Sequence, residues 1–225
     1  MTLLLFHAYP LDERMWARNR LPPARHAPRL YGLGDSIAAW ARAALAQVEG
    51  EVAVVGASMG GYCALEVARQ APERVRALAL VGSRAGDDPP ERREGRKRTF
   101  ELIETGGAQA LWEDMEPKLF SPHADAAVVA RARELALTRT TDELDRALEA
   151  IRDRDDVTDA VRDLDVPVLV ALGDDDPYFS VEEAEALTAS LRHPVLHVFQ
   201  RCGHLPNLER PDEFDRVVGS FLASV

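Results

Sequence analysis

A serine between two glycines is the residue of this chain whose setting most clearly favours chemistry. The stretch Gly56-Ala57-Ser58-Met59-Gly60 fits the pattern G-x-S-x-G, with the apolar run VAVVG leading into it and a helical pattern directly after it. A tight strand-to-helix turn of this kind holds a serine in a strained conformation and lifts its hydroxyl above the sheet edge, where a helix N-terminus favours negative charge. The pattern predicts a nucleophilic Ser58. The alternative is a glycine-rich turn that only caps a helix.

A serine nucleophile needs a base within hydrogen-bonding reach, and histidine is the usual one. His204 lies just after the apolar run VLHVF at 195–199 and before the last helical pattern, which places it at the same sheet edge as Ser58. His197 lies inside that run and is expected to be an ordinary strand residue. The remaining histidines precede the expected position of the base or fall in loops: His7, His26, His123 and His193. A structural role is the alternative for His204 too, because most loop histidines are structural.

The carboxylate that orients such a base is also expected after a strand. Asp174, Asp175 and Asp176 come directly after the apolar run VPVLVALG at 166–173. One of them suffices to orient an imidazole, and the other two then need solvated or capping roles, because adjacent buried carboxylates raise each other's pKa. A polar loop is one alternative. A metal site is another, although no histidine or further acid joins the three at ligand spacing.

These three positions depend on an alternation of short apolar runs and helical patterns. The runs are continuous and rich in Val and Leu, as in strands buried on both faces of a parallel sheet; they span 3–6, 52–56, 77–82, 166–173 and 195–199, with a weaker edge candidate at 27–31. Helical patterns follow most of them, with Ser180 and Glu183 forming a capping box for one helix. The alternation predicts a mostly parallel α/β sheet covered by helices on both faces.

One segment contains no buried strand. Residues 84–165 are charged and mostly helical in pattern, and about 80 residues are far too many for a connection between neighbouring strands. We therefore expect a small helical cap inserted at 84–165 into a core made of residues 1–83 and 166–225. We expect no internal repeat.

The acidic composition of the chain argues against negatively charged partners. The chain has 225 residues and a formal net charge of −11, so its surface repels nucleic acid and anionic membranes, and neither is expected as a partner. Cys63 and Cys202 are expected to be reduced, because two cysteines in a chain of this length make no disulfide framework. The N-terminus lacks the pattern of a signal peptide and no apolar run reaches the length of a membrane span, which favours a cytoplasmic location.

Four motifs in register resemble the α/β-hydrolase superfamily over nearly the whole chain. They are HAYPLDERMW at 7–16, GASMGG at 56–61, LGDDDP at 172–177 and GHLPNLERP at 203–211. Serine, aspartate and histidine follow one another in the order of that family. The first and last motifs and the small helical insert are most similar to bacterial esterases and lactonases of the enol-lactonase and non-haem perhydrolase type.

The resemblance assigns single residues. It implies that Asp176 is the acid, that His204 is the base, and that the backbone N–H groups of Met59 and Tyr9 form the oxyanion hole. The loop that carries Tyr9 reads His7-Ala8-Tyr9-Pro10, with alanine where the family usually has glycine, and His7 is then a structural residue. The antiparallel strand pair that normally opens the family's sheet is missing, so about six strands are expected.

The implied reaction is a two-step acyl transfer to Ser58 from a small-molecule ester or lactone, and it requires no metal or organic cofactor. A related carbon–carbon bond hydrolase or perhydrolase shares every motif and is the alternative, and a non-catalytic binding module on the same fold is a remote one. The sequence leaves a monomer and a homodimer equally open.

The helical insert is expected to cover Ser58 and to help line an apolar acyl pocket. Packing between insert and core is the alternative for each candidate residue: Trp16, Tyr62, Trp112, Met115, Leu119 and Phe120. The basic run RREGRKR at 92–98 is expected to be a solvated helix end. Cys202 is expected to be a small buried residue, and not a second nucleophile.

Overall fold

A single six-stranded parallel sheet forms the centre of the computed structural model, which describes residues 1–225. The strand order is β2-β1-β3-β4-β5-β6 and every neighbouring pair is parallel. The strands are β1 (Thr2–Phe6), β2 (Arg25–His26), β3 (Val52–Ala57), β4 (Val75–Val81), β5 (Val168–Gly173) and β6 (Pro194–Phe199). The prediction of a mostly parallel sheet of about six strands is confirmed.

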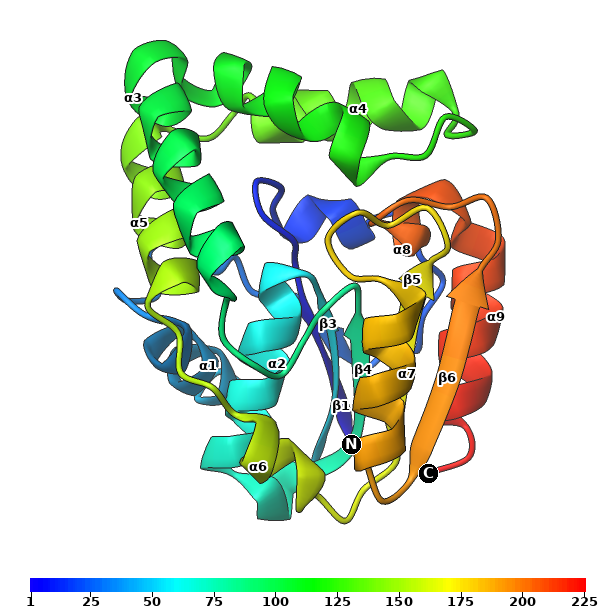
Figure 1. The fold of residues 1–225 in the computed structure, drawn as a ribbon. Helices are drawn as coiled ribbons and strands as arrows, with labels where there is room; N and C mark the ends of the chain where they lie inside the picture. Colours follow the sequence, from blue (N-terminus) through cyan, green and yellow to red (C-terminus); the bar gives the residue numbers. More distant parts are fainter.

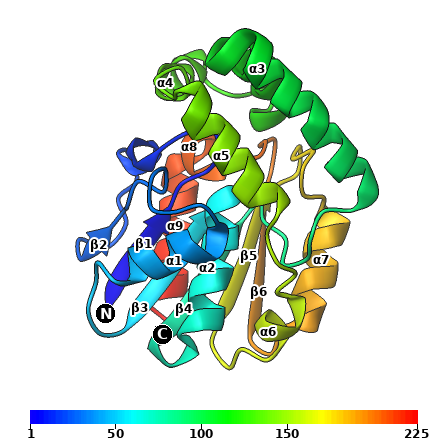
Figure 2. The same ribbon diagram turned by 90° about the vertical axis from the view of Figure 1, so that its left-hand side faces the viewer.

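The four inner strands β1, β3, β4 and β5 are buried because each face of the sheet has its own apolar layer, whereas the edge strands β2 and β6 are partly exposed. Alternate residues of a strand point to opposite faces, so Leu4 and Phe6 join one core cluster while Leu3 and Leu5 join the other. The first cluster lies under α1 (Ile37–Leu45), α2 (Met59–Gln70) and α7 (Val181–Ser190), and the second under α9 (Pro211–Leu222). Figures 1 and 2 show these helices on the two sides of the sheet.

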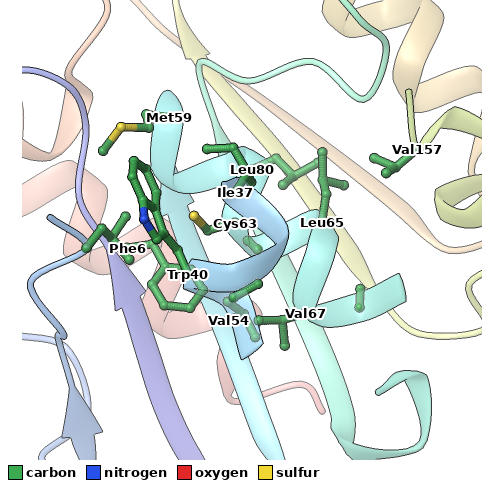
Figure 3. Close-up of a cluster of buried hydrophobic side chains, with 14 of the residues drawn as sticks. Phe6, Ile37, Trp40, Val54, Met59, Cys63, Leu65, Val67, Leu80 and Val157 are labelled. Carbon is green, nitrogen blue, oxygen red and sulfur yellow. The ribbon is translucent and has the colours of Figure 1, made fainter. Parts of the chain in front are cut away.

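Tight packing beneath α1 and α2 fixes the start of α2. Trp40 from α1 is almost completely buried against the sheet, in the same cluster as Phe6 and Met59, and Figure 3 shows these three side chains gathered at one end of the cluster. Met59 is the first residue of α2, so its side chain fixes the point at which the helix leaves the sheet.

The helix ends follow local capping chemistry. The Ser36 side chain accepts a hydrogen bond from Ala39 N–H at the start of α1, and Ser180 and Glu183 form the predicted capping box at the start of α7. Short helices complete the core: η1 (Glu13–Trp16), η2 (Pro72–Arg74) and α8 (Pro206–Glu209). No helix of the chain is long and apolar enough to cross a membrane.

The predicted edge strand at 27–31 is wrong in position. The edge strand is β2 at residues 25–26, and residues 27–30 form no strand. Pro28 has no N–H to donate to a ladder, and the N–H of Leu30 is bound by the His7 side chain, with Nε2 accepting at 3.0 Å. The side chain of Leu30 is completely buried, so packing and not pairing holds this segment.

Residues 84–165 contain helices only, and we call this segment the helical insert. It contains α3 (Pro90–Leu119), α4 (Ala126–Ala136), α5 (Thr141–Arg152) and α6 (Thr158–Arg162). Figure 1 shows α3 and α4 crossing above the carboxyl ends of the strands, whereas α6 lies low beside α2. Gly107, with φ of +59° and ψ of −149°, breaks α3 into two arms. That this segment acts as a cap remains a prediction.

Candidate active site

Ser58 stands in a strained backbone conformation between β3 and α2. Its φ of 52° and ψ of −116° lie outside the regions that non-glycine residues prefer, which costs about 1–3 kcal/mol. Hydrogen bonds hold this turn: Ser58 N–H donates to Val81 O, and Ser58 O accepts from Gly61 N–H and from the Ser83 hydroxyl, each at 2.8 Å. The strain is therefore compensated by the surrounding backbone, and Ser58 remains half-buried at the sheet edge.

The turn also requires close approach of neighbouring backbone. A Cβ atom at Gly60 would lie 2.2 Å from the carbonyl oxygen of Phe6, a separation that real atoms do not reach. Only glycine lets the first turn of α2 pack against the end of β1 at this point, which explains why a second glycine follows the serine.

His204 and Asp176 form a buried hydrogen-bonded pair. Asp176 Oδ2 accepts from His204 Nδ1 at 2.7 Å, and both side chains are at most 2% exposed. Asp176 Oδ1 accepts the N–H groups of Tyr178 at 2.8 Å and Phe179 at 3.2 Å. The Tyr178 ring packs edge-on against the imidazole at 4.9 Å. The carboxylate is held on both oxygens, and the pairing through Nδ1 leaves Nε2 of His204 as the basic nitrogen.

The other two aspartates of the cluster have different surroundings. The side chain of Asp174 accepts Cys202 N–H at 3.1 Å and so joins the end of β5 to the loop that carries His204. Burial acts to raise the pKa of Asp174, but backbone N–H groups of Arg201 and Cys202 outweigh it and lower the pKa. Asp175 is exposed. No group of three His, Cys, Asp or Glu side chains is arranged to hold a metal ion.

The loop after β1 lies opposite Met59. The N–H of Tyr9 has no acceptor in the protein, and the N–H of Met59, at the first position of a helix, has none within its helix. His7 is completely buried, and burial lowers its pKa to about 4; its Nε2 holds Leu30 N–H. Ala8 is buried and donates its N–H to Met15 Sδ at 3.2 Å. His7 is thus neutral and bound to the backbone, in the structural position expected for it.

A cavity of about 80 Å³ joins these residues. Ser58 and His204 line it together with Tyr9 and Met59, the two residues of the expected oxyanion hole. The complete lining is Tyr9, Ser58, Met59, Tyr62, Gly82, Arg84, Arg92, Arg96, Met115, Ile151, Tyr178 and His204. A larger outer cavity of about 380 Å³ shares five of those residues: Tyr9, Arg92, Arg96, Met115 and Tyr178. We call them the inner and the outer cavity.

Two of the six residues expected in the acyl pocket line the inner cavity, namely Tyr62 and Met115. The other four do not line either cavity, because they pack in the apolar layer under α9 and the helical insert: Trp16, Trp112, Leu119 and Phe120. Trp16, for example, contacts Phe214 of α9 with ring centroids 6.0 Å apart. The packing alternative describes these four residues.

Several residues near the site carry no sequence signal of their own. Gly82 has a φ of +59°, and a Cβ there would lie 2.9 Å from His204 Nδ1 and 3.1 Å from Asp176 Oδ2. Ser83 holds the carbonyl of Ser58. Arg92 and Arg96 belong to the basic run that we expected to be solvated, yet both line the two cavities. Their spacing of four residues, which places them on one face of a helix, is the one signal available in the sequence.

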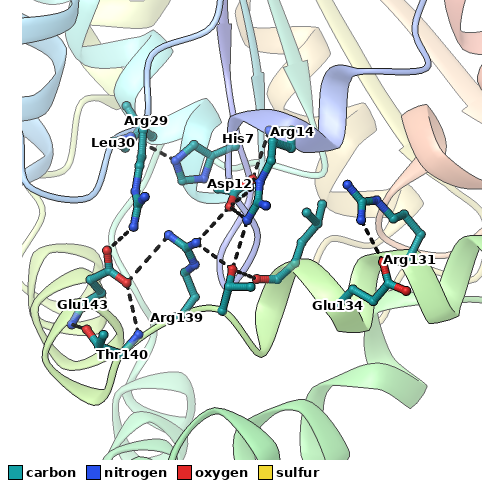
Figure 4. A network of polar contacts seen from close by, with 12 residues as sticks. His7, Asp12, Arg14, Arg29, Leu30, Arg131, Glu134, Arg139, Thr140 and Glu143 are labelled. Carbon is teal, nitrogen blue, oxygen red and sulfur yellow. Dashed lines mark hydrogen bonds and ion pairs between the residues drawn. The ribbon is translucent and has the colours of Figure 1, made fainter.

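The helical insert is attached beside the Tyr9 loop by a buried charge network. Asp12 Oδ2 accepts from Arg14 at 2.7 Å and from Arg139 at 3.0 Å, and Arg139 also lies 3.7 Å from Glu143 (Figure 4). Both Asp12 and Arg139 are at most 2% exposed. Burial acts to raise the pKa of Asp12, but hydrogen bonds from Arg14 together with the charge of Arg139 outweigh it and lower the pKa.

A second network of the same kind lies at the start of α3. Asp88 accepts from Arg154 at 2.9 Å and pairs with Arg96, and Arg154 stacks over the Tyr62 ring at 4.1 Å. Burial would raise the pKa of Asp88, but hydrogen bonds from the two arginines outweigh it and hold the pKa at about 2. Of the residues that line the inner cavity, this network holds Arg96 by an ion pair and Tyr62 by the stacked Arg154.

The far end of the insert holds the loop of His204. Leu119 O accepts His204 N–H at 3.0 Å, and the Glu209 carboxylate accepts Gly203 N–H at 2.9 Å and the Ser121 hydroxyl at 2.7 Å. Burial raises the pKa of Glu209. Cys202 and Cys63 are buried and unpaired, and burial raises the pKa of both thiols.

A strained serine at a strand-to-helix turn and the histidine of a buried histidine–aspartate pair line one cavity above a parallel sheet. This combination is typical of the α/β-hydrolase class. A profile of the alpha/beta hydrolase family matches residues 3–217, and the chain belongs to that family.

Among solved structures, a thermophilic esterase from Thermogutta terrifontis (malate bound) superimposes with a TM-score of 0.91 at 29% identity, over 100% of this chain and 90% of that one. The enol-lactonase from Burkholderia xenovorans LB400 shares the fold, with a TM-score of 0.85 at 22% identity, over 98% of this chain and 89% of that one.

Among proteins of known name, the chain is 28% identical to the pimeloyl-[acyl-carrier protein] methyl ester esterase of Neisseria meningitidis (strain FAM18), over 98% of this chain and 93% of that protein. It is also 28% identical to the 2-hydroxy-6-oxononadienedioate/2-hydroxy-6-oxononatrienedioate hydrolase of Paraburkholderia xenovorans, over 76% of this chain. The matched segment covers only 62% of that hydrolase.

Proposed function

We propose that this protein hydrolyses the ester or lactone bond of a small carboxylic ester through an acyl-enzyme on Ser58. The observation that carries the proposal is the inner cavity of about 80 Å³, which both the strained Ser58 and His204 line. Asp176 lies behind His204 and accepts its Nδ1 hydrogen bond. Similarity to two proteins named as esterases, at 28% and 29% identity over almost the whole chain, supports the same reaction.

The first half-reaction acylates the serine. Ser58 Oγ attacks the carbonyl carbon while Nε2 of His204 takes its proton, and Asp176 stabilises the imidazolium that forms. The N–H groups of Met59 and Tyr9 bind the oxyanion, a contribution of about 3 kcal/mol for each donor. The tetrahedral intermediate then expels the alkoxide, which takes the proton from His204.

The second half-reaction frees the serine. Nε2 of His204 takes a proton from a water molecule as its oxygen attacks the acyl carbon, and Ser58 leaves with that proton. The products are a carboxylic acid and an alcohol, or one hydroxy acid when the substrate is a lactone. No step draws on a group other than these residues and water.

The test is covalent labelling combined with turnover. A fluorophosphonate probe should label the wild-type protein and not Ser58→Ala, and p-nitrophenyl esters of graded chain length should be hydrolysed by the wild type alone. Labelling or turnover that persists in folded Ser58→Ala would rule out this mechanism.

A matched pair of variants tests the acid. Asp176→Asn should lower kcat by about 10⁴, as expected when a base loses the carboxylate that fixes its tautomer. Asp174→Asn removes a neighbouring carboxylate that binds only backbone and should cost less than about tenfold. If Asp174→Asn is the more damaging change, the assignment of Asp176 fails.

A second candidate is cleavage of a carbon–carbon bond by the same residues. Similarity to the hydrolase of Paraburkholderia xenovorans favours it, because a 2-hydroxy-6-oxo acid contains a ketone and no ester. Hydrolysis of a vinylogous diketone of that type, with no turnover of any ester by protein that the probe labels, would support this candidate over the first.

A further inference from the structure

The walls of the two cavities carry more positive than negative charge, although the chain as a whole is acidic. Arg84, Arg92 and Arg96 line the inner cavity with Ser58 and His204. The outer cavity adds Arg98 and Lys118, and its only acidic residues are Glu91 and Asp114. A cationic site in a protein of net charge −11 needs a specific explanation, since random placement would favour acidic walls.

Two of the three inner arginines are neutralised within the protein. Arg84 pairs with Glu183 at 2.7 Å, and Arg96 pairs with the buried Asp88. Each has a carboxylate that balances its charge, so neither requires a ligand.

Arg92 has no such partner. Its guanidinium donates to the carbonyl oxygen of Tyr178 and forms no ion pair. It is half-buried, and burial followed by the nearby charge of Arg84 lowers its pKa. Glu183 and Asp88 act in the opposite direction but do not outweigh these effects, and neither is paired with Arg92. A partly desolvated guanidinium without a paired carboxylate is costly, and Arg92 has further N–H donors that can bind.

Tyr9 also contributes a polar group without a partner. The Tyr9 hydroxyl is buried with no hydrogen-bond partner, and Tyr9, like Arg92, lines both cavities. Burial and the neighbouring Tyr31 raise the pKa of Tyr9, so its hydroxyl keeps its proton and remains a donor at neutral pH. Because that hydroxyl is closed to solvent, the charged fork of Arg92 is the group that the junction of the two cavities offers to a ligand.

We propose that the substrate carries a free carboxylate in addition to its ester or lactone bond, and that Arg92 binds this carboxylate at the junction of the inner and outer cavities. The planar guanidinium matches the two oxygens of a carboxylate. The inference rests on the proposed function, and it restricts the substrates to half-esters of dicarboxylic acids and to lactones with a carboxylate side group.

Matched esters test the inference. Monomethyl glutarate and monomethyl adipate are compared with methyl butyrate and methyl pentanoate, which lack only the terminal carboxylate. We expect kcat/KM to be at least about tenfold higher for the charged esters, because a hydrogen bond to a charged group has about that effect. Arg92→Gln should reduce the charged-to-neutral ratio by about tenfold, and Arg92→Lys should restore part of it.

The matched control is Arg93→Gln. Arg93 neighbours Arg92 on α3 but is exposed, lies outside both cavities and pairs with Asp87, so this variant should keep the wild-type ratio. A wild-type ratio near one, or an Arg92→Gln variant that loses activity equally on charged and neutral esters, would overturn the inference.

Binding without turnover separates this inference from the proposed function. Glutarate and adipate titrated into the protein by calorimetry should bind the wild type at least about tenfold more tightly than Arg92→Gln. Dicarboxylate binding that depends on Arg92 in a protein that hydrolyses no ester would retain the anion site and remove the proposed reaction. Ester turnover without dicarboxylate binding would support the proposed reaction and rule out the carboxylate site at Arg92.

Discussion

The core and the helical insert position their functional side chains by different means. In the core, backbone hydrogen bonds and close contacts hold Ser58 and Asp176, in surroundings that are almost entirely apolar. The helices of the insert are held by side-chain ion pairs, centred on Asp12 of the core, which binds Arg139, and on Asp88 of the insert, which binds Arg154. The proposed catalytic groups should therefore tolerate little change in shape, whereas the groups proposed to bind the substrate should respond to changes of charge.

Among the variants that compare the core with the insert, the largest effect is expected at Gly82, where the core has no room for a side chain. Gly82→Ala forces a methyl group against His204 and Asp176, so kcat/KM for p-nitrophenyl esters should fall by about 1,000-fold or more, which corresponds to about 4 kcal/mol in activation free energy. Gly50→Ala is the control, because Gly50 also has a positive φ, +69°, but open space around it. Equal losses of activity in both variants would show that backbone strain, and not the contact with His204, is responsible.

The next effect is expected in the stability of the protein, because the insert is joined to the core by the buried ion pair of Arg139 and Asp12. Arg139→Met leaves the buried Asp12 with Arg14 alone and should lower the free energy of unfolding by about 3 kcal/mol, measured by urea denaturation. Arg146→Met breaks an exposed ion pair with Asp142 on α5 and should change it by less than about 0.5 kcal/mol. Similar values for the two variants would contradict the role given to the Asp12 network.

The positions of residues that follow strands could be predicted from the sequence, whereas those of residues on the helices of the insert could not. Ser58 and the three aspartates at 174–176 follow buried strands, and His204 follows the edge strand β6. Parallel strands end at one edge, so the apolar runs predicted that these positions converge, whereas the choice of Asp176 among the three came from the family resemblance. That they perform the chemistry remains a prediction. Arg92 was expected to be solvated but lines both cavities, and Trp112 was a pocket candidate but packs in the apolar layer. Helical periodicity does not fix how the helices of the insert cross, and that crossing decides whether a residue faces the site or the core.

Acid should weaken the insert in a defined range. The pKa of Asp88 is about 2 in the folded protein and 3.8 ordinarily, so its ion pairs contribute fully above pH 4 and are lost as the pH falls from about 4 to about 2. The difference in unfolding free energy between the wild type and Asp88→Asn should therefore shrink by about 2 kcal/mol over that range. A difference that stays constant with pH would contradict the assigned pKa.

The smallest effect is expected where insert and core meet at the His204 loop. Glu209→Gln keeps the shape and one acceptor for Gly203 and Ser121. Because burial already raises the pKa of Glu209, loss of the charge offsets the loss of hydrogen bonding, and stability should change by less than about 1 kcal/mol. The kcat of this variant should fall less than tenfold. A loss as large as that of Gly82→Ala would move Glu209 into the group that fixes the base.

The break at Gly107 divides α3 into one part that lines the cavities and another that contacts the His204 loop. The arm before it carries Arg92 and Arg96, and the arm after it ends at Leu119, whose carbonyl holds the backbone of His204. If Arg92 selects the substrate as proposed, substitutions in the first arm should change substrate selectivity without disturbing the contact that the second arm makes with His204. A combinatorial library limited to positions 92, 95, 96 and 99, all of which line the outer cavity, is the economical place to search for altered selectivity.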